Sequence, residues 1–358
     1  MLKRTRTRSF AAGLMLAALA LGACSSDAGS DTTIVADTTA ADTGAVDTAS
    51  PSESVPASEA ATADTVPAPA AAGAGIKLAV NPWTGSAVNA NVAKVVLESM
   101  GTPVELVDID ENATWAGLDA GDLDAVLEVW PSGHAKDFDT YITGKKSVVE
   151  LGKLGPQARI GWYVPQFVLD ENPSLATWEG FKDAALAKKF ATAESGDLGQ
   201  FLMGDPSYVS YDEQVIKNLN LPLKYVVAGS EAALITAIQQ AEADKKPLLL
   251  QFWQPHWLQS KVKLARVALP DPTDACAASA AAKDGKYACD YPVDVLYKAA
   301  SAKLEAKNAM AFAFLQKFQM TTDQQNEIAA LVDSDKMKAD AAAKQWVAAN
   351  PDAVKAWM

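Results

Sequence analysis

The feature that most constrains the fold is an alternation of short apolar strands with helical stretches, which occurs twice along the chain. The first occurrence predicts a strand over 76–80, a helix over 87–100, and then strand, helix and strand over 104–107, 115–120 and 125–129. The second predicts the same order over 190–193, 211–219, 224–227, 231–243 and 248–252. Strand–helix–strand order is typical of parallel sheets with right-handed crossovers. We therefore expect an α/β protein with two similar lobes.

The chain is expected to divide into five segments. They are a signal peptide over 1–23, a lipidated Cys24 with a disordered tether over 24–75, the first part of lobe I over 76–163, lobe II over 164–265, and a return to lobe I over 266–358. From residue 293 onward this return is expected to be mostly helical and to pack on the first lobe.

The N-terminus predicts export. Basic residues precede an apolar run of about a dozen residues, which is too short to span a bilayer as a mature helix. Leu21-Gly22-Ala23-Cys24 then resembles the bacterial lipobox, in which the cysteine is lipidated; an ordinary signal peptide with a chance cysteine is the alternative. Residues 25–75 contain no Lys, Arg or aromatic residue and predict a flexible tether. We expect a protein held by a lipid anchor on the outer face of the cytoplasmic membrane, at the cell surface or in the periplasm.

Composition excludes several classes of function. The net charge of −13 argues against nucleic acid as a partner. Cys276 and Cys289 form one possible pair, and a disulfide between them is expected outside the cytoplasm. The scattered thiols and two histidines show no metal-ligand spacing, so neither a metal nor a cofactor is expected. Enzyme motifs are missing from the sequence, and Glu194-Ser195-Gly196-Asp197 is interpreted as a turn.

Three tryptophans follow predicted strands. Trp83, Trp130 and Trp253 each come at or just after a strand end, where open α/β sheets bind their ligands. A quaternary ammonium has no N–H to donate, so its matching partner is a box of aromatic faces that act through apolar contact and cation–π attraction. The three residues therefore predict an aromatic cage in a cleft between the lobes, and burial in the core is the alternative for each of them.

A carboxylate on such a ligand would need a separate site. Gly85 and Ser86 open the first predicted helix, whose backbone N–H groups suit an anion, and Gly85 permits close approach. A plain helix cap without ligand is the alternative. His256 is a candidate donor and His134 its counterpart in the other lobe, although either is equally compatible with a structural role. Trp257 is interpreted as a packing residue.

Four motifs together resemble the substrate-binding proteins of bacterial ABC importers for glycine betaine, choline and related quaternary amines, the OpuAC-like family. The resemblance covers about residues 76–350, and its motifs are Asn81-Pro82-Trp83-Thr84-Gly85, Leu118 to Asp124 leading to Glu128-Val129-Trp130-Pro131, Gly161-Trp162-Tyr163-Val164-Pro165, and Phe252-Trp253-Gln254-Pro255-His256-Trp257. It implies a two-lobe fold of the type II periplasmic-binding-protein class, with a hinge and an interlobe cleft. It also implies a cage built mainly from Trp130 and Trp253, with Trp83 and with Trp162 or Tyr163 as a further wall.

The sequence departs from the family pattern at two places. Many choline binders carry an acid where this chain has Gly85, which favours a ligand with its own carboxylate. Some betaine binders carry a tryptophan in the loop over 193–200, and this chain has none there. Glu128 lies on the same face of its strand as Trp130, where it either approaches a cation or is a carboxylate that is solvated or supports the binding residues from behind.

The sequence thus predicts a monomeric, extracytoplasmic solute-binding protein that captures glycine betaine or a related quaternary amine and delivers it to an ABC permease. Two alternatives remain open: a receptor of the same fold for choline, carnitine or another solute, and a sensory surface lipoprotein that is not coupled to transport. An enzyme is the weakest hypothesis, because candidate catalytic groups are so few.

Overall fold

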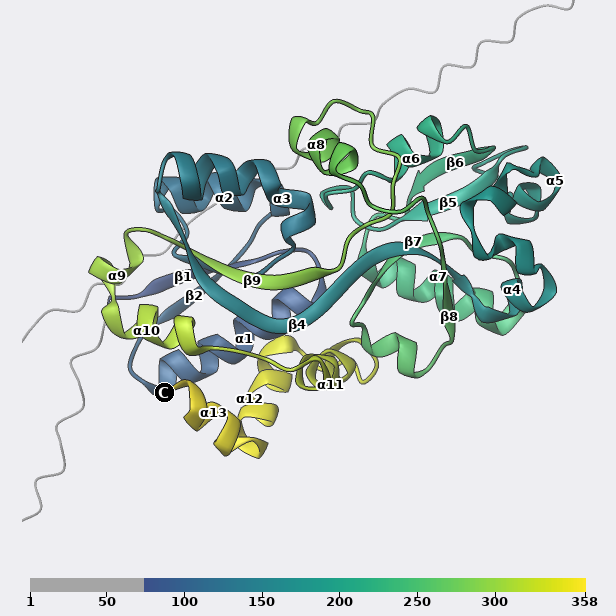
Figure 1. Ribbon diagram of the computed structural model, residues 1–358. Coiled ribbons are helices and arrows are strands. Elements are labelled where there is room, and N and C mark those ends of the chain that lie inside the picture. Colours follow the sequence, from purple (N-terminus) through teal and green to yellow (C-terminus); the bar gives the residue numbers. More distant parts are fainter. Residues whose placement is uncertain (1–73) are drawn as a thin grey trace, which may run out of the picture. The chain divides into compact units, whose positions relative to one another are not determined.

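The computed structural model describes residues 74–358 (Figure 1). The predicted signal peptide, Cys24 and the tether up to residue 73 lie outside the described residues. The strands are β1 (Ile76–Val80), β2 (Val104–Asp108), β3 (Ala125–Val129), β4 (Val148–Pro165), β5 (Gly199–Met203), β6 (Leu223–Val227), β7 (Leu250–Gln254), β8 (Leu264–Val267) and β9 (Asp294–Ser301).

The helices alternate with these strands and then follow them. They are α1 (Thr84–Ser99), α2 (Glu111–Ala120), α3 (Pro131–Asp137), α4 (Gln166–Glu171), α5 (Ala184–Ala187), α6 (Asp212–Asn218), α7 (Glu231–Asp244), α8 (Asp274–Ala282), α9 (Leu304–Lys307), α10 (Ala309–Lys317), α11 (Thr322–Asp333), α12 (Ala339–Ala349) and α13 (Pro351–Trp357). Within the described residues, none of these helices combines the length and the apolar character needed to cross a membrane.

The strands form two lobes that share β4. In the first lobe β1 pairs in parallel with β2 and β3, and β9 pairs antiparallel with β3 and β4. In the second lobe β5 pairs in parallel with β6 and β7, while β7 and β8 pair antiparallel with β4. The C-terminal helices α11 and α12 pack against α1 of the first lobe (Figure 1). The chain therefore crosses between the lobes in β4 and returns to the first lobe in β9.

The strand predicted over 190–193 is wrong. Lys188–Phe190 is a 3-10 turn, and the strand that enters the sheet is β5, at Gly199–Met203. Phe190 is buried in the core of the second lobe, which explains the apolar signal. The segment after it is a hydrogen-bonded turn, in which the Ser195 hydroxyl accepts from the backbone N–H of Thr192 at 2.9 Å. The interpretation of Glu194 to Asp197 as a turn is confirmed.

Two long antiparallel strands were not expected. β4 is interrupted by Gly152 and Gly155, both at positive φ, and its register with β9 shifts at these points. A Cβ at Gly155 would lie 2.1 Å from the carbonyl oxygen of Met320, so the backbone approaches too closely for a side chain. These breaks remove the regular alternation by which a strand is recognised in sequence. The C-terminal part is otherwise helical, as predicted.

A buried lysine joins β9 to the end of α10. Lys298 is fully buried, and its ammonium donates to the carbonyl oxygens of Leu315 at 2.7 Å, Gln316 at 3.1 Å and Phe318. Burial lowers the pKa of Lys298 to about 8. The side chain satisfies carbonyl groups that the last turn of a helix leaves without partners.

Cys276 and Cys289 form a disulfide, with their Cα atoms 6.2 Å apart. It ties α8 to the segment that leads into β9.

Candidate ligand-binding site

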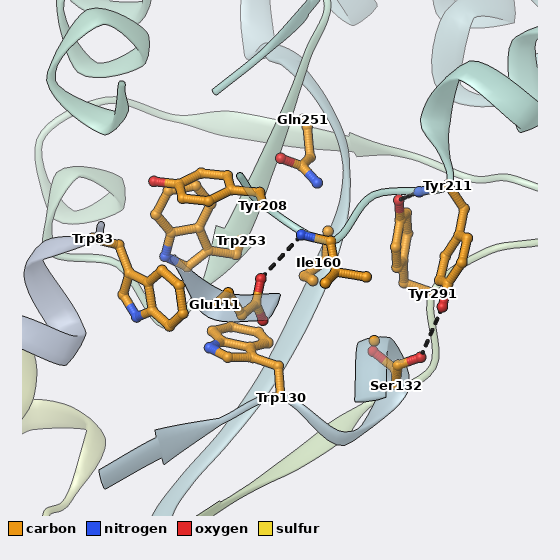
Figure 2. Close-up of a pocket in the computed structure, with 12 residues that line it drawn as sticks. Trp83, Glu111, Trp130, Ser132, Ile160, Tyr208, Tyr211, Gln251, Trp253 and Tyr291 are labelled. Carbon is orange, nitrogen blue, oxygen red and sulfur yellow. Dashed lines mark hydrogen bonds between the residues drawn. The ribbon is translucent and has the colours of Figure 1, made fainter. Parts of the chain in front are cut away.

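The three tryptophans that follow strands line one pocket between the lobes (Figure 2). Trp83 precedes α1 and Trp130 follows β3, so both belong to the first lobe, whereas Trp253 lies in β7 of the second lobe. Their exposed fractions are only 6–8%. Strand ends of two sheets thus bring together side chains that lie up to 170 positions apart in the sequence.

Tyr208 completes the aromatic wall and was not predicted. Its ring centroid lies 5.8 Å from those of both Trp83 and Trp253, in edge-to-face geometry. The residue lies in the loop after β5, so it occupies the same kind of position as Trp83 after β1. Because the sequence prediction placed this strand at 190–193, the loop that carries Tyr208 was not recognised as the end of a strand.

A carboxylate lies directly behind the cage. Glu128 Oε1 accepts hydrogen bonds from the indole N–H of Trp83 at 2.7 Å and of Trp130 at 3.0 Å. Its Oε2 accepts from the side-chain amides of Asn89 at 2.8 Å and Gln325 at 2.9 Å. Burial raises the pKa of Glu128 to about 7, although the indole hydrogen bonds oppose this shift. Glu128 is therefore enclosed and is not solvated by bulk water; it supports two of the cage residues from behind, which was part of the same expected alternative.

The start of α1 is occupied from within the protein. The backbone N–H of Thr84 donates to Glu231 Oε2 of the second lobe at 2.6 Å, and the Ser86 hydroxyl accepts from the N–H of Asn81 at 2.9 Å. Gly85 does allow a close approach, as predicted, but the approaching groups are Glu128 and Gln325: a Cβ would lie 2.9 Å and 2.6 Å from them. Gly85 and Ser86 line no part of the aromatic pocket.

His256 pairs with the same glutamate. Its Nε2 lies 3.0 Å from Glu231 Oε1, and its Nδ1 accepts from the N–H of Leu258 at 3.1 Å. Both ring nitrogens are thus engaged, and His256 lines a smaller polar hollow beside the cage instead of the cage itself. Trp257 is buried, as expected of a packing residue, and its indole N–H also donates to Asp333 at 2.7 Å.

Hydrogen bonds cross directly between the lobes around the pocket. The Tyr208 hydroxyl donates to the carbonyl oxygen of Pro82 at 2.9 Å, and the N–H of Val209 donates to Glu111 Oε2 at 3.0 Å. With the bond from Thr84 to Glu231, these contacts hold the loop after β5 and the start of α7 against the first lobe. The aromatic cage is therefore assembled only when the lobes approach each other.

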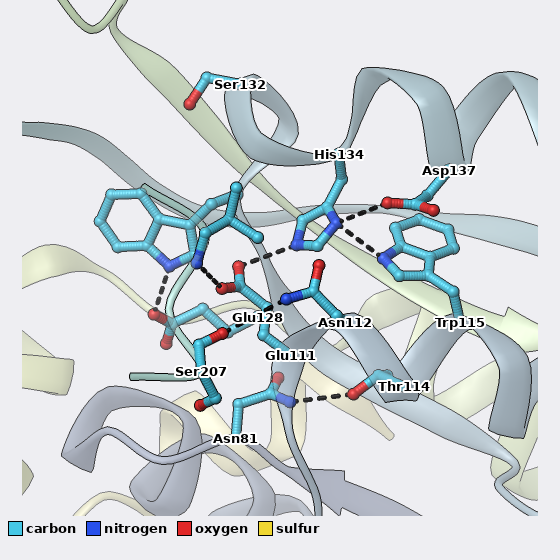
Figure 3. A network of polar contacts seen from close by, with 12 residues as sticks. Asn81, Glu111, Asn112, Thr114, Trp115, Glu128, Ser132, His134, Asp137 and Ser207 are labelled. Atoms are coloured by element: carbon cyan, nitrogen blue, oxygen red, sulfur yellow. Dashed lines mark hydrogen bonds and ion pairs between the residues drawn. The ribbon is translucent and has the colours of Figure 1, made fainter. Parts of the chain in front are cut away.

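His134 supports the second-lobe contact without lining the pocket (Figure 3). Its Nε2 lies 2.8 Å from Glu111 Oε1 and its Nδ1 lies 3.0 Å from Asp137 Oδ2. Burial opposes the charged ring, but the hydrogen bonds to Asp137 and Glu111 outweigh it and raise the pKa of His134 to about 9. The indole N–H of Trp115 also lies 3.0 Å from Nδ1, so three side chains hold the ring in place beside Glu111.

One amide oxygen in the pocket has no hydrogen-bond partner among the described residues. Gln251 lies two residues before Trp253 on β7 and therefore on the same face. Its Oε1 is buried and accepts no hydrogen bond from any described residue. None of the residues that line the aromatic pocket, all from the described part of the chain, is Lys, Arg or His. The polar side-chain groups that line it are hydroxyl groups, indole N–H groups, the amide of Gln251 and the carboxylate of Glu111, whose two oxygens already contact His134 and Val209.

The sequence matches, over residues 74–349, the family described as the substrate binding domain of ABC-type glycine betaine transport systems. The chain belongs to this family. It is therefore the substrate-binding protein of an ABC transporter of the glycine betaine type.

Individual relatives agree with the family. The trimethylamine N-oxide-binding protein of Pelagibacter ubique (strain HTCC1062) is 30% identical over 280 residues, which cover 77% of this chain and 88% of that protein. The glycine betaine, L-proline-binding protein ProX of Borrelia burgdorferi has a TM-score of 0.65 at 18% identity, with 79% of this chain and 96% of that chain covered. Lactococcal OpuAC in its closed-liganded conformation with glycine betaine has a TM-score of 0.62 at 20% identity, with 79% and 98% covered. These structures confirm the two-lobe fold.

Two residues that the family resemblance placed in the cage of this betaine-type domain lie elsewhere. Trp162 is fully buried in the core of the second lobe, where its indole N–H donates to Asp212 at 2.7 Å. Tyr163, on the opposite face of β4, is fully buried in the main core. Neither residue lines the pocket, and Tyr208 forms its fourth aromatic wall instead.

Three side chains of types that can bind a metal ion also lie close together in the domain. Ligand-type atoms of Glu231, His256 and Asp333 lie within 4.8 Å of one another. Each is already bonded inside the protein, since Asp333 accepts from the hydroxyl of Thr84 at 2.9 Å in addition to Trp257. Internal hydrogen bonds therefore account for the cluster, and we assign no metal to it.

Proposed function

We propose that this protein is the extracytoplasmic receptor of an ABC importer, and that it captures glycine betaine or a related quaternary amine and delivers it to the permease. The observation that carries the proposal is the aromatic cage of Trp83, Trp130, Tyr208 and Trp253, contributed by both lobes. The proposed role is binding without chemistry, so no residue is given a catalytic function.

The aromatic faces of the cage can supply a large share of the binding free energy that this role requires. Each aromatic face contributes about 0.5–2 kcal/mol to a desolvated cation. Four faces therefore contribute several kcal/mol of the roughly 8 kcal/mol that micromolar binding requires. The remainder would come from apolar contact of the methyl groups and from the hydrogen bonds that form when the lobes meet.

A second candidate ligand is trimethylamine N-oxide. It carries the same trimethylated nitrogen but no carboxylate. Two observations favour it: the N-terminus of α1 is already occupied by Glu231, and the residues that line the pocket include no cationic side chain to meet a carboxylate. The relative from Pelagibacter ubique bears the name of this ligand.

We further propose a division into lobes and a mode of membrane attachment. Lobe I comprises 76–158 and 294–358, and lobe II comprises 159–293. These bounds differ from those expected from the sequence because Val267, Cys276 and Tyr291 pack in the same core as Trp162. Lipidation of Cys24 would anchor a monomeric receptor on the outer face of the cytoplasmic membrane through the segment over 24–75. Incorporation of labelled palmitate into the wild type, and its loss in Cys24→Ala, would test the anchor.

Isothermal titration calorimetry with glycine betaine, proline betaine, carnitine, choline and trimethylamine N-oxide tests the proposed function. We expect Trp130→Ala and Trp253→Ala to weaken binding of the best ligand by at least about 2 kcal/mol, which is about 30-fold, because each removes an aromatic face and its apolar contact. Trp178→Ala is the matched control, since Trp178 is partly exposed and does not line the pocket. A wild-type protein that binds none of the five compounds would refute the proposed function.

A further inference from the structure

The hydrogen-bond partners of Glu128 are all donors. Two are indole N–H groups, which can only donate, and two are side-chain amides that turn their NH2 groups toward the carboxylate. The amide oxygens, Asn89 Oδ1 and Gln325 Oε1, are left buried without hydrogen-bond partners among the described residues. A protonated carboxyl would direct its O–H at one of these donors. The network therefore fits the ionised form of Glu128.

This carboxylate has no cation beside it in the described structure. Three glutamates are buried around the cleft, and two of them have a histidine partner: Glu111 lies 2.8 Å from His134 and Glu231 lies 3.0 Å from His256. Glu128 is 2% exposed and forms no ion pair with any described Lys, Arg or His. Burial of a charge without a partner is costly, so such groups are retained where they serve a site.

The same carboxylate holds two walls of the cage. Trp83 and Trp130 come from different elements, and both indole N–H groups converge on Glu128 Oε1. A shared acceptor fixes the relative orientation of two aromatic faces that would otherwise rotate about their side-chain bonds. Gly85 makes room for this arrangement, because a side chain there would meet Glu128 and Gln325.

We propose that Glu128 is a positioning residue of the cage, which orients Trp83 and Trp130 and places an uncompensated negative charge behind them, so that the site prefers a cationic methylated group over an uncharged group of the same shape. The inference rests on the proposed function, since it concerns the ligand of the same cage. A bound cation supplies the counter-charge that the protein itself does not provide.

The test compares ligands that differ only in charge. In choline and 3,3-dimethylbutan-1-ol, and in glycine betaine and 3,3-dimethylbutanoate, a quaternary nitrogen is replaced by a quaternary carbon. We expect Glu128→Gln to weaken calorimetric binding of the cationic-nitrogen member by at least about tenfold and to change binding of its carbon counterpart by less than about threefold. Glu128→Asp, which keeps the charge, should retain the preference. Glu305→Gln is the matched control, because Glu305 is exposed on α9.

The outcomes separate the two proposals. Equal weakening of both members of a pair would mean a purely structural role and would overturn the inference, as would no change in either. A wild-type protein that binds none of the five compounds of the calorimetric panel refutes the proposed function and this inference with it, whereas a wild-type protein that binds the carbon member of a pair as tightly as the nitrogen member overturns this inference alone.

A measurement on the wild type covers the case in which Glu128→Gln does not fold. The affinity ratio within a pair should rise between about pH 5.5 and about pH 8.5 as the carboxylate ionises. The other charged groups near the cage are Glu231 on α7 with its partner His256, Glu111 on α2 with its partner His134, Asp205 in the loop after β5, and Asp333 on α11. A constant ratio across this range would overturn the inference.

Discussion

Tyr208 allows closure of the lobes and aromatic contact to be measured separately. Its hydroxyl donates to the carbonyl oxygen of Pro82 across the cleft at 2.9 Å, while its ring meets Trp83 and Trp253. Tyr208→Phe removes only the hydrogen bond, whose net value is about 1 kcal/mol, so we expect about fivefold weaker ligand binding. Tyr208→Ala also removes an aromatic face worth about 0.5–2 kcal/mol, so the total loss should be about 1.5–3 kcal/mol, or about 10- to 150-fold.

Isothermal titration calorimetry measures the loss of affinity in both variants, with whichever of glycine betaine, choline and trimethylamine N-oxide binds the wild type most tightly. The thermal unfolding midpoint without ligand should change little in Tyr208→Phe, because the hydroxyl bond joins the lobes and lies outside the core of each. Tyr225→Phe, in the second lobe but away from the pocket, is the matched control. The reasoning would be refuted if Tyr208→Ala bound within about twofold of the wild type, or if the Phe and Ala variants were equally weak.

Three further results are expected. Gly85→Ala should weaken ligand binding by about tenfold in calorimetry, because its Cβ would displace Glu128 and Gln325 and misalign the cage; unchanged affinity would contradict the network. Since burial raises the pKa of Glu128 to about 7, a cationic ligand that favours the ionised form should bind with nearly constant affinity above about pH 8. Below about pH 7 its affinity should fall by up to about tenfold for each pH unit. A flat profile down to about pH 5.5 would argue against this linkage. Lys298→Met should lower the free energy of unfolding by about 2 kcal/mol in a denaturant titration, because three carbonyl groups at the end of α10 lose their donor; an unchanged or higher value would contradict that role.

The sequence was most informative where apolar runs and strand ends coincide. The strands β1, β2, β3, β6 and β7 were predicted near their observed bounds, since each is a short, mostly apolar run between turn or helix signals. Parallel connection then places Trp83 and Trp130 on one sheet edge, and the structure brings both to the pocket with Trp253. β5 was misplaced because Phe190 gives an equally strong apolar signal from a 3-10 turn.

Partners within the site could not be predicted from sequence. The sequence indicated that the N-terminus of α1 suits an anion, and an anion is bound there, but it is Glu231, 147 positions away. Glu128 was placed on the face of Trp130, whereas its contact with Gln325 spans 197 positions. Such pairings depend on how two lobes and a returning C-terminal segment meet. A single sequence indicates which polar groups need hydrogen-bond partners, but it does not indicate which distant residues provide them.

The strand β4 belongs to the sheets of both lobes. Its pairing passes from β9 to β7 between Ala158 and Arg159, and Arg159 is held at this junction by the carbonyl oxygen of Tyr291 at 3.1 Å. Relative rotation of the lobes must therefore appear as a change of twist in one continuous strand. Amide hydrogen exchange at the junction would then respond to ligand. The backbone of β4 would report occupancy of the cleft even where its own side chains never touch the ligand.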